Sequence, residues 1–72
     1  MIDSGVRDVT KRVRKILATS PLPEIRHIQV EQDGDRLYLH GRVRSFYAKQ
    51  MAQEAVRQSV RGMQLVNDIA VD

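Results

Sequence analysis

The chain has 72 residues, of which 42% are hydrophobic and 29% are charged, and it has no cysteine. This length allows one small domain over residues 1–72 and excludes two-domain enzymes and transmembrane bundles, while the ordinary mixture of apolar and charged residues excludes wholesale disorder. The lack of cysteine excludes disulfides, thiolate nucleophiles and cysteine-based metal sites, and the net charge of +3 favours anionic partners such as phospholipid headgroups or nucleic acid.

The first predicted element is a helix over residues 6–17, where apolar side chains recur at spacings of three and four. Asp3 or Ser4 is expected to cap its first turn, and Pro21 disfavours helical geometry at the residue before it. The apolar positions of the stripe are Val6, Val9, Val13, Ile16 and Leu17. The cations on the opposite side are Arg7, Lys11, Arg14 and Lys15. This helix is therefore predicted to be apolar on one side and cationic on the other.

Two strands are predicted next, at residues 27–31 and 36–43, because apolar and polar side chains alternate there. The Asp-Gly dipeptide at 33–34 suits a two-residue type I′ turn between them. A register shifted by two residues, with the turn at 34–35, is the open alternative. A shift by one residue is disfavoured because it would point the apolar side chains of one strand toward solvent.

A second helix is predicted over residues 46–61, with Ser45 as its N-cap and Gly62 at its C′ position. The small and aliphatic residues at helical spacing are Ala48, Met51, Ala52, Ala55, Val56, Ser59 and Val60. Because alanines dominate this stripe, the helix is expected to approach its packing partner closely.

The last predicted element is a strand outlined by Met63, Val66, Ile69 and Val71. Asn67-Asp68 interrupts the two-residue alternation, so a bulge or a bend is expected there. The order of elements predicts an α+β fold, an αββαβ two-layer sandwich with two helices packed on one face of a three-stranded sheet. The other sheet face is left polar and open, and it is the candidate partner-binding surface. Its candidate residues are Arg36, Tyr38, His40 and Arg42.

Glycines and aliphatic residues follow a joint spacing along most of the chain. The hairpin region reads Ile28-x-Val30-x-x-x-Gly34-x-x-Leu37-x-Leu39-x-Gly41-x-Val43. It is followed by Ala48, Ala52 and Ala55, then by Gly62-Met63 and Val66-Asn67-Asp68-Ile69-x-Val71. Over roughly residues 9–72 this pattern resembles the BON domain, the module named for bacterial osmotically inducible and nodulation proteins. The resemblance implies an αββαβ fold with a mixed sheet, no catalysis, and attachment to phospholipid membrane surfaces or to other envelope proteins.

His27 and His40 would face each other in the type I′ register, with Glu31 nearby. Structural zinc takes four protein ligands and catalytic zinc takes three, so the pair is interpreted as exposed histidines, and neither a metal nor a cofactor is expected. The pattern shows no nucleophile with its base, and Ser4 and Ser45 fit as helix caps. We therefore expect no catalytic residues and no enzymatic activity.

Single-stranded nucleic acid is one alternative ligand, because two ring side chains, Tyr38 and His40, stand between arginines on the predicted open face. The order of elements also matches the KH fold, but the GXXG loop that clamps phosphates in that fold is absent. With one large aromatic side chain on the face, nucleic acid is the less favoured ligand.

The favoured interpretation is a non-catalytic adaptor that attaches its parent protein to anionic phospholipid surfaces through the cationic helix, with Leu22 as a shallow apolar contact. The alternative is a protein–protein interaction or oligomerisation module of an envelope protein. No stretch approaches the ~20 apolar residues of a membrane span, and the N-terminus lacks an apolar signal core. The expected compartment is the periplasm or cell envelope for a domain excised from an exported protein, and the cytoplasm otherwise. We expect the isolated domain to be monomeric.

Overall fold

The computed structural model describes the backbone of residues 4–72 and the side chains from Val9 onward. Its elements are α1 (Ser4–Ala18), the 3₁₀ turn η1 (Pro23–Ile25), β1 (Gln29–Asp33), β2 (Arg36–Val43), α2 (Phe46–Val56), the 3₁₀ turn η2 (Arg57–Val60) and β3 (Gln64–Val71). Ser4 is the first residue of α1, and the other expected cap, Asp3, lies outside the described residues.

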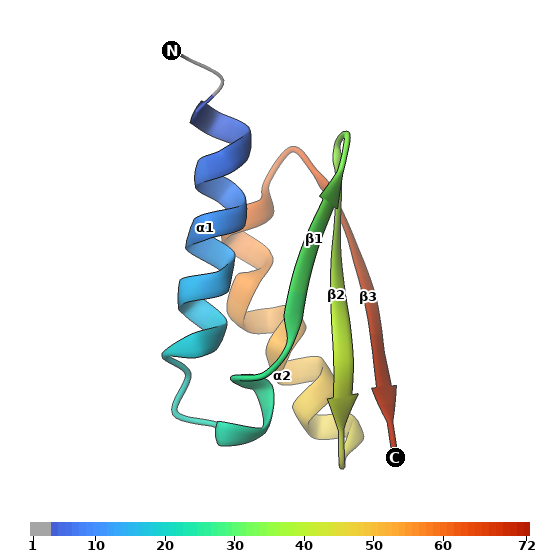
Figure 1. Cartoon of the computed structure of the whole chain (residues 1–72). Coiled ribbons are helices and arrows are strands. Elements are labelled where there is room, and N and C mark those ends of the chain that lie inside the picture. The colour runs from blue at the N-terminus through green and yellow to red at the C-terminus, as the bar shows by residue number, and fades with distance from the viewer. Residues whose placement is uncertain (1–3) are drawn as a thin grey trace.

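The strands form one mixed sheet in the order β1-β2-β3. β1 and β2 pair antiparallel as a hairpin, whereas β2 and β3 run parallel and are connected through α2. Figure 1 shows α1 and α2 on the same side of this sheet, with β3 along its outer edge. The predicted αββαβ sandwich is therefore confirmed, and the other face of the sheet is uncovered.

The core lies between the helices and the sheet. Val13 of α1, Leu39 of β2 and Val56 of α2 are fully buried in one apolar cluster. Ala48 and Ala52 are also fully buried, which lets the backbone of α2 pack close to the sheet as its alanine stripe predicts. The other buried apolar residues are Leu17, Ile25, Ile28, Val30, Leu37, Val43, Val60 and Ile69.

The hairpin turns at Gly34-Asp35, so the type I′ turn predicted at 33–34 is wrong and the alternative register is confirmed. Gly34 has φ +64, while no described non-glycine residue has a positive φ. Positive φ at the first central residue alone fits a type II′ turn, which prefers glycine there. Gln32 donates from Nε2 to the Gly34 carbonyl at 2.9 Å, and the opposite charges of Asp33 and Arg36 pair across the ladder beside the turn.

Gly41 lies against Ile28 of the chain just before β1. A Cβ at this position would make van der Waals contact with Ile28 at 3.4 Å, and the φ of +150, which residues with a side chain rarely adopt, is what favours glycine here. In this register His40 lies opposite Gln29. The expected pairing of His27 with His40 is therefore wrong, because the ladder is shifted by two residues.

β3 is regular, and the bulge predicted at Asn67-Asp68 is wrong. Its register with β2 is continuous from Arg36↔Gln64 to Val43↔Val71. Asn67 takes a place on the helix-facing side and donates from Nδ2 to the Lys49 carbonyl at 3.2 Å and to Gln53 Oε1 at 2.9 Å. Asn67 therefore continues the alternation as an inward-facing residue, and α2 supplies the acceptors for its side-chain amide.

The second helix begins as predicted and ends earlier. Ser45 Oγ accepts a hydrogen bond from the Ala48 N–H at 3.1 Å, which confirms the N-cap. α2 ends at Val56 and the chain tightens into η2 before Gly62, whose φ of +83 suits the residue without a side chain. The predicted end at residue 61 therefore counted the 3₁₀ turn as helix.

Candidate membrane and partner interfaces

The outward side of α1 carries a group of cations that we call the cationic face, formed by Lys11, Arg14 and Lys15. These side chains are exposed and lie three and four residues apart, so they are neighbours on the side opposite the buried Val13 and Leu17. Among the described side chains, no ion pair engages the cationic face. The predicted fourth member, Arg7, lies in α1 one turn before Lys11, and its side chain is outside the described part of the chain.

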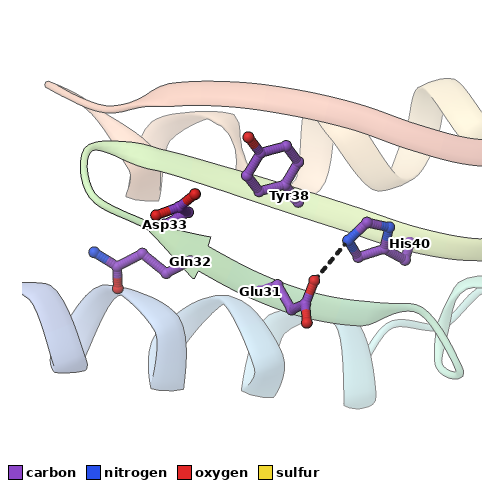
Figure 2. A pocket seen from close by; sticks show the side chains of 5 residues that line it. All are labelled: Glu31, Gln32, Asp33, Tyr38 and His40. Atoms are coloured by element: carbon purple, nitrogen blue, oxygen red, sulfur yellow. Dashed lines mark hydrogen bonds and ion pairs between the residues drawn. The ribbon is translucent and has the colours of Figure 1, made fainter.

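The uncovered side of the sheet is the open sheet face. The structure brings Tyr38 and His40 together there, with their rings stacked at a centroid distance of 5.9 Å and an interplanar angle of 6°. Figure 2 shows both side chains rising from β2, with Glu31 reaching toward the imidazole from β1. The parallel register places Val66 and Asp68 of β3 beside them.

Acidic groups on both sides engage His40. Its Nε2 lies 3.0 Å from Glu31 Oε1, and its Nδ1 lies 3.6 Å from Asp68 Oδ2. The two carboxylates approach opposite nitrogens of one ring, so they do not converge on a common point. Within the described residues there is no group of three or more His, Asp or Glu side chains placed to hold a metal ion.

The arginines at the two ends of this face also have partners. A side-chain hydrogen bond with Tyr38, followed by electrostatic interaction with the same residue, raises the pKa of Arg36 above its usual value. Arg42 Nη1 lies 3.6 Å from Asp72 Oδ1. The four predicted residues therefore share one face as expected, but acidic groups stand among them. The open sheet face thus presents fixed charges of both signs.

A polar hollow of about 380 Å³ lies on the open sheet face beside the hairpin. Its lining residues are Glu31, Gln32, Asp33, Tyr38 and His40. Carboxylates, a phenol and an imidazole suit contact with a polar or cationic side chain of another protein.

A second hollow, of about 330 Å³, lies between α2 and the loop that follows α1, and we call it the aromatic hollow. Its lining residues are Ser20, Pro21, Leu22, Ile25, Tyr47, Met51 and Ala55. Tyr47 is 65% exposed and the adjacent Phe46 is 62% exposed. The helical spacing placed Met51 and Ala55 in the buried stripe, and this is wrong, because both are exposed. The only sequence signal for this surface is the Phe-Tyr pair outside the alanine stripe.

Hydrogen bonds hold the wall of the aromatic hollow in place. Ser20 Oγ accepts from the Leu22 N–H at 3.0 Å, and the Ser20 carbonyl accepts from Arg26 Nε at 2.6 Å. Glu24 Oε2 accepts from the Arg44 N–H at 2.6 Å, which ties η1 to the chain just before α2. Two of these bonds therefore order the loop itself, and the third joins it to the segment that leads into α2.

A family model described as the BON domain matches residues 5–72. No curated protein and no solved structure matches the chain. Among the described residues, every helix is too short or too polar to cross a lipid bilayer.

Proposed function

Since the chain belongs to the BON domain family, whose members are non-catalytic binding modules, we propose that it attaches its parent protein to anionic phospholipid membrane surfaces. The observation that supports this proposal is the cationic face of α1. Lys11, Arg14 and Lys15 are exposed, of one sign, and without an ion-pair partner among the described side chains. A planar anionic leaflet can contact all three at once because they lie along one side of one helix.

The expected strength of this contact is modest. Each cation near an anionic leaflet contributes about 1 kcal/mol, so the four positions including Arg7 contribute about 4 kcal/mol. That free energy corresponds to a dissociation constant of about 1 mM. The cationic face therefore needs tandem copies or a second contact to retain a protein at a membrane.

Vesicle co-sedimentation tests the proposal. Wild-type protein is expected to sediment with vesicles containing anionic lipid, less at ~1 M salt than at ~0.1 M, because the Debye length falls from about 10 Å to about 3 Å. Lys11→Glu with Arg14→Glu removes two attractions worth about 2 kcal/mol and weakens binding at least about thirtyfold. Unchanged sedimentation of this double variant would reject the cationic face.

The matched control is Arg36→Glu with Arg42→Glu, which changes the charge equally on the opposite side of the molecule. Because the open sheet face already carries carboxylates beside both arginines, we expect this variant to bind vesicles like the wild type. Size-exclusion chromatography beside the sedimentation assay separates lipid contact from self-association.

The open sheet face supports a second candidate function, binding to another protein. The supporting observation is that this face carries carboxylates, Glu31 and Asp68 beside His40, together with the cations Arg36 and Arg42, on three strands. Such a pattern suits a partner with complementary charges and gives no uniform attraction for a polyanion. Nucleic acid is the weaker candidate for the same reason. A concentration-dependent mass that Arg42→Glu abolishes would support self-association through this face, and a constant monomer mass would reject it.

A further inference from the structure

The exposed large apolar side chains are concentrated in one region of the molecule. Among the described residues these side chains are Phe46, Tyr47, Met51 and Val71. Three of the four belong to α2, where Tyr47 and Met51 line the aromatic hollow and Phe46 precedes Tyr47 in the first turn. Leu22 on the facing loop is half-buried and extends the same apolar surface. Contiguous exposed apolar surface of this kind marks an interaction site more often than isolated residues do.

The fold itself does not use these side chains. The buried stripe of α2 consists of Ala48, Ala52 and Val56, and it brings the helix close to the sheet. Phe46 and Tyr47 project from the first turn of the helix, away from that stripe, so packing of the core does not require aromatic residues there. The fold therefore does not account for two large apolar side chains at these positions.

The charges around the aromatic hollow indicate what kind of partner fits. Arg26 and Arg44 are exposed near the aromatic hollow without lining it. The bond from Arg26 Nε to the Ser20 carbonyl keeps its guanidinium beside a lining residue, and Arg44 directly precedes the N-cap of α2. The carboxylate of Glu24 is engaged by the Arg44 N–H, and Glu54 pairs with Arg57 at 3.3 Å. Among the described side chains, Arg26 and Arg44 make no ion pair, so two cations without a carboxylate partner lie near an apolar surface.

We propose that this surface is the part of the domain that enters the lipid interface. Phe46 and Tyr47 reach the boundary between headgroups and acyl chains, Met51 and Leu22 contact the acyl chains, and Arg26 and Arg44 contact anionic headgroups. Aromatic side chains favour this boundary, and cations beside apolar residues are typical of segments that lie in the interface. A phospholipid leaflet has an anionic headgroup layer next to an apolar acyl layer, so it can contact the arginines and the apolar side chains at the same time.

This inference rests on the proposed membrane attachment and supplies its second contact. A lipid surface is favoured over a protein partner because the two aromatic rings protrude, and a deformable lipid interface can accommodate them without a preformed pocket. A protein would have to offer a matched cavity for each ring.

The test uses tryptophan fluorescence, since the chain has no tryptophan of its own. Phe46→Trp and Tyr47→Trp are expected to give a blue-shifted emission on addition of anionic vesicles, and brominated acyl chains are expected to quench it. Ala70→Trp, at an exposed position of β3 on the open sheet face, is the matched control and is expected to show neither change. Phe46→Ser with Tyr47→Ser is expected to lower vesicle partitioning at least about tenfold, because two large apolar side chains leave the interface.

The outcomes separate this inference from the proposed function. If the wild type sediments but the tryptophans at positions 46 and 47 show no blue shift, the inference is overturned and the cationic face remains the proposed membrane contact. If both tryptophans show a blue shift and the double variant Lys11→Glu with Arg14→Glu sediments like the wild type, the inference is supported and the cationic face is rejected. If the wild type does not sediment with vesicles and neither tryptophan variant shows a blue shift, both the inference and the proposed function are overturned.

Discussion

Replacement of Asn67 by alanine is expected to destabilise the domain, because it removes the hydrogen bonds by which this side chain ties β3 to α2. The side chain donates to the Lys49 carbonyl and to Gln53 Oε1, and its Oδ1 accepts from the Ile69 N–H at 3.3 Å. Three hydrogen bonds at about 0.5–1.5 kcal/mol each would together contribute about 1.5–4.5 kcal/mol. Two of the three are longer than 3.1 Å, which favours the lower half of this range.

The position of the Ile69 N–H lowers the expected cost further. The Gln64 N–H donates toward β2, to the Asp35 carbonyl at 2.8 Å. Because backbone groups alternate in direction along a strand, the N–H of Ile69 points to the free edge of β3, where water can replace Asn67. We therefore expect a loss of about 2 kcal/mol, which in a domain of this size lowers Tm by roughly 8–16 °C.

Urea unfolding followed by circular dichroism measures this loss. Asn67→Asp is the informative comparison, because it keeps the acceptor for Ile69 but turns a carboxylate toward the two oxygens on α2, and it should be at least as destabilising as alanine. Asp68→Ala changes the next residue along the chain, which is exposed, and its free energy of unfolding should stay within about 0.5 kcal/mol of the wild-type value. If Asn67→Ala also stayed within that margin, the hydrogen bonds to α2 would not stabilise the fold, and the reasoning would fail.

Three further substitutions test the local geometry by the same urea assay. Gly41→Ala should lower the stability by about 1–3 kcal/mol, because residues with a side chain rarely adopt a φ of +150. A variant as stable as the wild type would contradict that backbone geometry. Gly34→Ala should lower the free energy of unfolding by about 1–2 kcal/mol through its positive φ alone, since no atom lies within 4 Å of a Cβ built there. Gly34→Asn should lower it less, because asparagine tolerates this conformation better, and equal losses for the two variants would count against a purely conformational effect. Ser45→Ala should cost about 1 kcal/mol by leaving the Ala48 N–H without its cap, whereas Ser45→Asp should be close to neutral, and no difference between the two would refute the capping role.

Local sequence patterns were sufficient to predict the structure wherever the stabilising interaction joins residues only a few positions apart. The apolar spacing of α1 correctly separated its buried residues, such as Val13, from the cations of the opposite side. The cap at Ser45 is a contact between residues three apart and was likewise predictable. The four residues predicted to share the open sheet face do share it, because a shift of two residues in the hairpin leaves every side chain on the same side.

The candidate surfaces show where such patterns fail. The carboxylates that contact His40 come from two different strands, so neither contact can be read without the ladder register. Met51 lies at helical spacing from the alanines, yet it sits at the margin of the stripe and faces the loop after α1 rather than the sheet. The aromatic hollow depends on that loop and on α2 together, and no segment of the sequence contains it.

Taken alone, the sequence determined the order of the elements, the class of the fold and the two sides of each helix and strand, because periodicity and turn chemistry are properties of neighbouring residues. Tertiary structure decided the rest. It selected the turn at Gly34-Asp35 over the turn one residue earlier, placed Asn67 inward against α2, and left Phe46 and Tyr47 in solvent. The physical reason is that hydropathy records how polar a side chain is, whereas burial depends on which backbone, glycine or hydrogen-bond partner the packed elements bring opposite it.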